Sequence, residues 1–169
     1  MELLTALETR SSAARLAPPG PTPQQMTRLL DLAARAPDHG RLKPWRLIVV
    51  DEGLREAFAL AAAEAKRLRL PTWSAAQVEA EREKYRRSPA IVVVGCAVRR
   101  DQTKVPEIEQ FAAAAAAAQN LFLAAYDMGY GVMWKTGAAA YDPGVKACLG
   151  LKVDDHIVAI MHMGARINA

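Results

Sequence analysis

Hydrophobic residues recur at helical spacing over much of the chain and gather elsewhere in short continuous runs. The segment 2–9 places three leucines on one face and therefore predicts a short amphipathic helix. Apolar runs rich in β-branched residues are typical of strands buried in a sheet. Such runs lie at 47–50, 90–98, 132–135 and 157–163, and each predicts a strand.

Several helices are predicted from residues that are typical of helix ends. Thr22 is a good N-cap, Pro23 suits the first helical position, and the helix that follows should stop near Ala36 because Pro37 comes next. Four proline residues within 17–23 indicate a rigid connector before it. Further helices are expected at 52–68, 74–87, 106–128 and 143–149.

The predicted helix at 106–128 is the longest and has an unusual composition. It starts at Pro106 with two glutamates in its first turn, which suits the positive end of the helix dipole. Residues 112–118 are seven consecutive alanines, the best helix former, and Gly129 suits the end of the helix. A side without bulky groups also allows another helix, or a planar ligand, to approach the backbone closely.

Strands and long helices alternate irregularly along the sequence. We therefore predict an α+β fold in one domain, 1–169, with a mixed central β-sheet flanked by helices that include the long alanine-rich one. The chain carries no internal repeat or linker composition.

Charge and composition narrow the functional classes. The net charge is +4, but in 79–87 cations alternate with glutamates at helical spacing, which predicts a solvated, ion-paired helix face. No nucleic-acid-binding motif accompanies the charge. The longest apolar stretch, 111–118, is too short to span a bilayer, and the N-terminus lacks the apolar core of a signal peptide, so we expect a cytoplasmic protein. Cys96 lies in an apolar run and should be buried, whereas a disulfide to Cys148 remains open.

Residues for self-contained catalysis are missing. Gly129-Tyr130-Gly131 lacks a third glycine and follows a helix, which disfavours a classical dinucleotide site, and Ser11, Ser12 and Ser74 lack a nucleophile-elbow setting. No metal-ligand set is evident.

The histidines divide into two groups. His156 and His162 fall on the last predicted strand, where structural or surface roles are expected. His39 sits between Pro37 and Pro44 in a loop that is either simply polar or presents a donor to an anionic or carbonyl-bearing ligand.

Three short segments together resemble the flavin-dependent nitroreductase family, in particular its small YdjA-like branch. They are Arg10-Ser11-Ser12, the loop from Ala36-Pro37 to Pro44-Trp45, and Gly129-x-Gly131-x-x-Trp134, in the family's order. In the second segment Arg41 and Lys43 stand where the family has asparagine and glutamine.

The resemblance implies a nitroreductase-like fold and a homodimer with FMN at the subunit interface. The expected activity is transfer of hydride from NADH or NADPH through the flavin to a nitroaromatic, quinone or similar small-molecule acceptor. No catalytic side chain is needed, because the cofactor carries the chemistry. The alternative is a flavin-binding protein of the same fold that sequesters or fragments flavin or performs reductive dehalogenation.

The resemblance also assigns site residues. Those expected to contact FMN are Arg10, Ser11, Ser12, Trp134, Lys135 and Thr136, with Arg35 and His39 reaching it from the other subunit. The nicotinamide is expected near Ala124, Ala125, Tyr126, Asp127, Met128 and Gly129. The cations available to stabilise an anionic reduced flavin are Arg10, Arg35, Arg41 and Lys43, and Arg166 is available for a phosphate.

Overall fold

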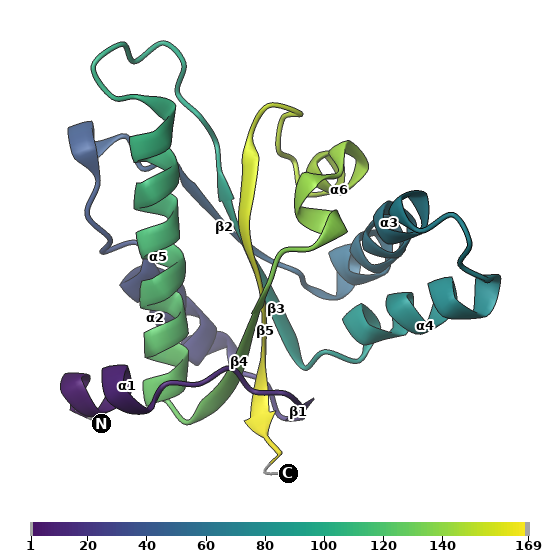
Figure 1. Cartoon of the computed structure of the whole chain (residues 1–169). Helices are drawn as coiled ribbons and strands as arrows, with labels where there is room; N and C mark the ends of the chain where they lie inside the picture. Colours follow the sequence, from purple (N-terminus) through teal and green to yellow (C-terminus); the bar gives the residue numbers. More distant parts are fainter. Residues whose placement is uncertain (1, 168–169) are drawn as a thin grey trace.

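The computed structural model describes residues 2–167 (Figure 1). Its helices are α1 (Leu3–Thr9), α2 (Pro23–Ala33), α3 (Glu52–Arg69), α4 (Ala75–Arg86), α5 (Glu107–Asp127) and α6 (Pro143–Cys148), with 3₁₀ turns η1 (His39–Arg41) and η2 (Ala138–Tyr141). Its strands are β1 (Leu16–Ala17), β2 (Trp45–Val49), β3 (Ala90–Cys96), β4 (Tyr130–Lys135) and β5 (His156–Arg166). The predicted helices and strands are confirmed, with ends that differ by a few residues.

The sheet is organised around the long strand β5. Met163 of β5 pairs with Ala90 of β3 and also with Val132 of β4, so these two strands lie on opposite sides of β5. Strand β2 pairs with the outer edge of β3, and the two-residue β1 pairs with the last residues of β5.

The α+β class is confirmed, but the prediction of a mixed sheet is corrected. Every strand pairing among the described residues is antiparallel. The single helix α5 returns the chain so that β3 and β4 run in the same direction, as a one-helix crossover does. Strand β5 lies between them and is antiparallel to both, which prevents a parallel pair.

Side-chain caps fix where several helices begin. Thr22 and Ser74 each form a capping box with the glutamine three residues later, at the starts of α2 and α4. Asp51 and Asp142 accept hydrogen bonds from backbone N–H groups at the starts of α3 and α6. These caps explain why the predicted N-termini of these helices were accurate.

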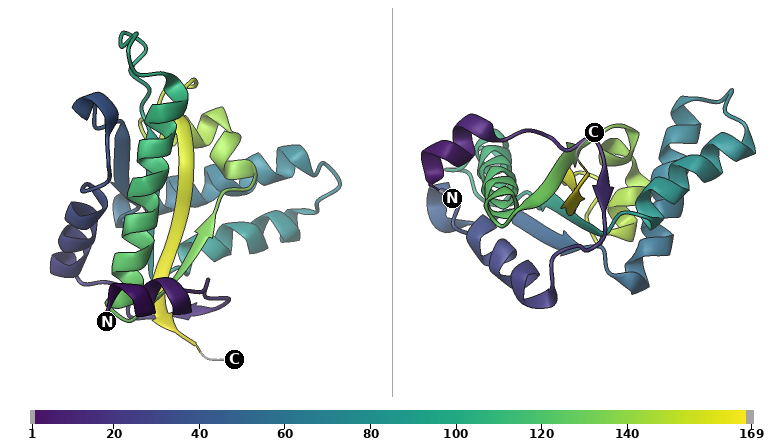
Figure 2. Two further views of the ribbon diagram at one scale, coloured as in Figure 1. Left: turned by 60° about the vertical axis from the view of Figure 1, so that its left-hand side comes forward. Right: turned by 90° about the horizontal axis from the view of Figure 1, so that it is seen from below.

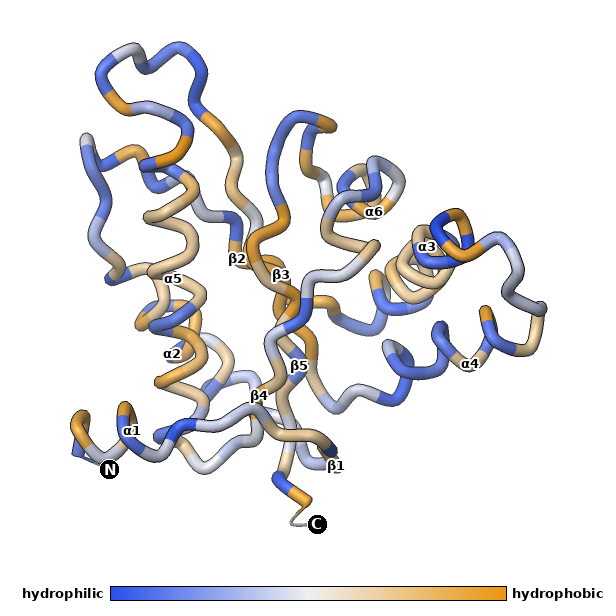
Figure 3. Tube along the Cα trace, in the orientation of Figure 1, coloured by the Kyte–Doolittle hydropathy of each residue, from blue (hydrophilic) through white to orange (hydrophobic). Residues whose placement is uncertain are grey.

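The two faces of the sheet are covered by different helices (Figures 1 and 2). Alternate residues of β3 point to opposite faces. Val92 and Val94 join a core with α2 and α5, whereas Ile91 and Val93 join a second core with α3, α4 and α6. In Figure 3 α5 is mostly hydrophobic, while α4 is mostly hydrophilic. The alanine-rich side of α5 thus packs against the sheet.

The structure also describes the cysteines, the membrane-spanning potential of the helices and the grouping of potential metal ligands. Cys96 and Cys148 are free thiols, and burial raises the pKa of Cys96 to about 11. Within residues 2–167, no helix combines the length and apolar character needed to span a bilayer, and no cluster of three potential metal ligands occurs.

Candidate functional site

The segment that follows α1 crosses β4 at very short range. The backbone N–H of Ala13 donates to the carbonyl of Val132 at 2.9 Å. A Cβ atom at Gly131 would lie 2.7 Å from Leu16 Cδ2 and 2.9 Å from Arg166 Cγ. Glycine at 131 is therefore required for the segment to lie where it does, which gives the second glycine of the Gly-x-Gly motif a packing role.

Two arginines are held at the start of this crossing by aromatic rings of α5. The guanidinium of Arg10 lies 5.0 Å from the ring centre of Phe122, and that of Arg166 lies 4.2 Å from the ring centre of Tyr126. The hydroxyl of Tyr126 donates to the backbone carbonyl of Thr9 at 2.8 Å and so ties α5 to the end of α1. The fold thus brings together the two cations from opposite ends of the sequence.

Ser11 and Ser12 follow Arg10 directly and are exposed. Their hydroxyls can therefore act as donors beside the two guanidinium groups. Such a set of cations and hydroxyls suits an anion such as a phosphate.

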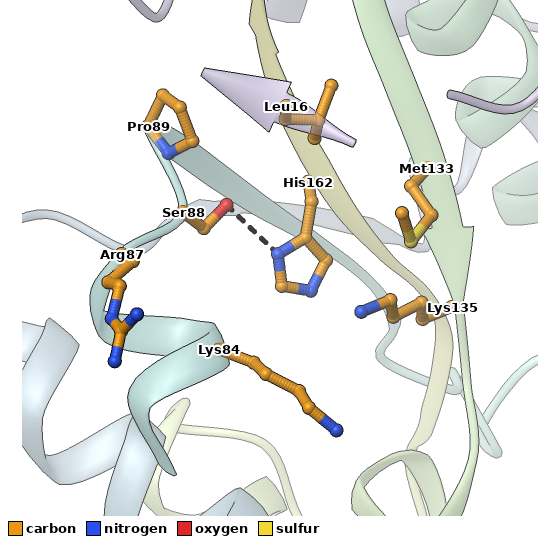
Figure 4. A pocket seen from close by; sticks show the side chains of 8 residues that line it. All are labelled: Leu16, Lys84, Arg87, Ser88, Pro89, Met133, Lys135 and His162. Atoms are coloured by element: carbon orange, nitrogen blue, oxygen red, sulfur yellow. Dashed lines mark hydrogen bonds between the residues drawn. The ribbon is translucent and has the colours of Figure 1, made fainter. Parts of the chain in front are cut away.

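A pocket of 180 Å³ lies on the other side of the crossing, between α4, β4 and β5 (Figure 4). Side chains alternate along β4, so Met133 and Lys135 face this pocket. Leu16 lines it as well, so the crossing segment leads from Arg10 to the pocket. Its described lining includes the cations Lys84, Arg87 and Lys135 and no carboxylate.

A second pocket, of 330 Å³, shares Lys84 and Lys135 with the first and is lined also by Thr136 and Lys66. Its one carboxylate is Glu81, which is 7% exposed and accepts hydrogen bonds from Lys66 at 3.0 Å and Lys84 at 2.7 Å. Burial raises the pKa of Glu81, but these two bonds outweigh the burial and leave it below its ordinary value. The surroundings of Lys135 are therefore positive on balance, and burial lowers the pKa of Lys135 itself.

His162 of β5 forms part of the wall of the first pocket. It is 4% exposed, and its Nδ1 lies 2.9 Å from the Oγ of Ser88, whereas its Nε2 has no hydrogen-bond partner among residues 2–167. Burial, followed by the positive charges of Lys135 and Arg55, lowers the pKa of His162 to about 3. The ring is therefore neutral at ordinary pH. Its position was expected to be structural or on the surface, and it is buried at a pocket.

Trp134 lies on the opposite face of the sheet from Lys135. Its indole N–H donates to the carbonyl of Val158 at 3.2 Å, and its ring packs in the core beside α5. The structure therefore brings together Lys135 and Thr136 but turns the side chain of Trp134 away from them.

Arg35 and His39 lie in a different region of the molecule. His39 is exposed and contacts the carboxylate of Glu109 near the start of α5, whereas Arg10 rests on Phe122 near its end. At 1.5 Å per residue these two points on α5 are roughly 20 Å apart. Within one chain, His39 is thus remote from Arg10.

Arg41 and Lys43 belong to the same remote loop. Both side chains are exposed, and both residues have positive φ angles of 54° and 48°. The cations that line the pockets are instead Lys66, Lys84, Arg87 and Lys135.

The residues expected near the nicotinamide form the last turn of α5 and its cap. Ala125 and Tyr126 are buried, while Ala124 and Asp127 line a shallow pocket of 250 Å³ beside α1. Met128 is partly buried, and the exposed Gly129 ends the helix with a φ of 88°. Tyr126, in the same turn of α5, carries Arg166 on its ring.

Four polar residues that line the first pocket were not predicted from the sequence as site residues: Lys84, Arg87, Ser88 and His162. The ion-paired face predicted for 79–87 does exist, since Arg86 pairs with Glu56, Glu79 and Glu83. Lys84 is on the side of α4 that faces the pocket. The periodicity of charges within one helix does not show which of its sides faces a pocket.

The comparisons with known proteins identify the family and the fold. The model of the nitroreductase family matches residues 7–165. YdjA of Escherichia coli strain K12, provisionally named an NAD(P)H nitroreductase, is 34% identical over 164 residues that cover 97% of this chain and 88% of the relative.

Two solved structures share the fold. A nitroreductase-like family protein from Bacillus cereus superposes with a TM-score of 0.81 at 25% identity, covering 100% of this chain and 88% of that chain. The FMN- and NADPH-dependent nitroreductase NfnB from Sphigopyxis sp. strain HMH gives a TM-score of 0.73 at 20% identity, covering 98% and 89%. On the match of the family model and the identity to YdjA, this chain belongs to the nitroreductase family.

Proposed function

We propose that this chain is an FMN-dependent oxidoreductase that uses NADH or NADPH to reduce a nitroaromatic, quinone or similar acceptor, and that it works in the cytoplasm as a homodimer. The observation that carries the proposal is the pocket lined by Lys84, Arg87 and Lys135 and, among the described residues, by no carboxylate. Outside this lining, Lys84 also pairs with Glu81 and Arg87 with Glu83. Family membership and the relatives named as NAD(P)H nitroreductases support the same class of reaction.

The residues along the crossing segment fit the two ends of FMN. A phosphate is a dianion, and it suits Arg10, Arg166 and the exposed hydroxyls of Ser11 and Ser12. The flavin ring carries carbonyl oxygens and is planar, and it suits the pocket with Lys135 and its neighbour Thr136.

The pocket lysines Lys84 and Lys135 act on the flavin through their positive charge. FMN, when bound, supplies the redox chemistry by taking up a hydride from NADH or NADPH and giving two electrons to the acceptor. Lys84 and Lys135 stabilise negative charge in the pocket, and they do so more strongly than in water because Lys135 is half-buried. The protein thereby supplies position and charge in place of an acid–base pair.

A second copy of the chain completes the proposed site. His39 is remote from Arg10 within one chain, so it can serve the same FMN only if it comes from a partner subunit, and we propose that Arg35 comes with it. The last turn of α5, Ala124 to Gly129, is proposed to lie near the nicotinamide.

Flavin binding by matched variants tests the proposal. Arg10→Ala and Lys135→Met should each weaken FMN binding about tenfold or more, since each removes a charged contact. Lys152→Ala, which removes an exposed cation outside both pockets, is the control and should leave binding unchanged. Equal FMN affinity in all four proteins contradicts the assignment. Steady oxidation of NADH or NADPH with a nitroaromatic acceptor separates the reductase from the flavin-binding alternative.

A further inference from the structure

His162 keeps one polar atom unpaired inside the pocket between α4 and β4. The side chain is 4% exposed, and Figure 4 shows its Nε2 edge turned toward the side from which Lys135 enters. Within the described residues Nε2 has no hydrogen-bond partner. Leaving a buried polar atom unpaired costs free energy, so such an atom at a pocket wall points to a ligand group that pairs with it.

The hydrogen-bond network decides whether Nε2 donates or accepts. The hydroxyl of Ser88 donates to the carbonyl of Ala90 at 3.1 Å, which leaves its oxygen to accept a hydrogen bond from Nδ1–H of His162 at 2.9 Å, and we assign the proton of the neutral ring to Nδ1 on this network. Since the pKa of His162 is about 3, the ring is neutral and Nε2 keeps its lone pair near neutral pH. Nε2 is thus an acceptor.

Donors lie in the same pocket as this acceptor. Lys135 enters beside Nε2, and Lys84 reaches toward the same space from α4 (Figure 4). Lys84 uses one of its three N–H donors on Glu81 at 2.7 Å, which leaves others for a ligand. His162 Nε2 is thus an acceptor with the ammonium donors of Lys84 and Lys135 nearby. This arrangement complements a ligand edge on which an N–H group is flanked by two carbonyl oxygens.

The pyrimidine ring of a flavin has such an edge, since its imide N–H lies between two carbonyl groups. Resting on the FMN function proposed above, we propose that His162 Nε2 accepts the imide N–H of the bound flavin, with Lys84 and Lys135 as donors to the flanking oxygens. His162 is then the residue that selects an unsubstituted imide over an N-alkylated ring.

The probe is 3-methyl-FMN, in which a methyl group replaces the imide proton. Dissociation constants for FMN and 3-methyl-FMN are measured by flavin fluorescence on the wild-type protein and on three variants. The wild type should prefer FMN by about tenfold, the value of one hydrogen bond. His162→Ala should lose this preference, and His162→Gln should keep part of it because its amide oxygen can accept. His156→Gln, which removes a histidine at the far end of β5, is the control and should keep the full preference.

The outcomes are distinguishable. A preference that persists in His162→Ala, or its absence in the wild type, overturns the role of His162 while leaving FMN binding intact. Failure of the wild type to bind either flavin overturns the proposed function itself. If His162→Ala does not fold, the wild type gives the answer: with ¹⁵N labels in FMN and the protein, a scalar coupling between the imide nitrogen and His162 Nε2 supports the bond, and its absence rejects it.

Discussion

The neutral, buried His162 makes a sharp prediction about stability in mild acid. Its ordinary pKa of 6.5 falls to about 3 in the folded protein, chiefly because of burial. As the pH falls through 6.5, the unfolded chain takes up a proton on this histidine while the folded chain does not. Folding stability is therefore lost as the pH falls between 6.5 and 3.

The size of the effect follows from the two pKa values. Between pH 7 and pH 5 the unfolded state gains about 2 kcal/mol from protonation of this one side chain. A folded pKa of 4 gives nearly the same figure at pH 5, so the expectation depends little on the value in the folded state. Carboxylates and the other histidines also change the unfolding free energy in acid. Their contribution cancels when the wild type and a variant are compared over the same pH interval.

Urea unfolding at pH 7 and pH 5, at one flavin concentration, measures the effect. His162→Gln should lose about 2 kcal/mol less stability than the wild type over this interval. Tyr85→Phe is the matched control, because the ring centres of Tyr85 and His162 lie 5.5 Å apart and the pKa of Tyr85, about 12, lies far above pH 5–7. Equal losses in the wild type and His162→Gln would refute the assignment of a buried, neutral histidine.

Three further predictions concern packing and orientation. Gly131→Val should destabilise the protein by about 1–3 kcal/mol in thermal or urea unfolding, because even a Cβ atom there comes within 3 Å of neighbouring side chains; an unchanged stability contradicts the crossing geometry. Trp134→Phe should lower the stability of the fold but retain FMN affinity, whereas Lys135→Met should retain the stability and weaken FMN binding. A large loss of FMN binding in Trp134→Phe would show that the indole faces the flavin. A thiol reagent should label Cys148 alone in the native protein and Cys96 only after unfolding, because Cys96 is fully buried and its pKa is about 11; rapid native labelling of both rejects this burial.

The sequence predicted the helices well because their end signals are local. Thr22 and Ser74 cap helices through glutamines three residues away, and Gly129 ends α5 with a positive φ. Strand β1 was missed because two residues carry no periodicity, and it exists only through pairing with the end of β5. The mixed sheet was wrong because strand order is a tertiary property: nothing within β3 or β4 indicates that β5 lies between them.

The site was predicted only in part for the same reason. Residue types at segment ends indicated Arg10 and Lys135, and the resemblance to a family supplied their proposed roles. Lys84 was not predicted because it is one of many charged residues in α4, and His162 was not predicted because it lies in an apolar strand. Their convergence depends on how α4 packs against β4 and β5, which no local pattern specifies. Trp134 shows the converse, since it neighbours Lys135 in sequence but faces the opposite core.

The most direct test of the central claim is the visible absorption spectrum of the purified protein, with heat release and identification of any chromophore. We expect flavin bands, with FMN alone in the supernatant, and recovery of the same spectrum when FMN is added back. A colourless protein that also fails to bind added FMN would contradict the claim.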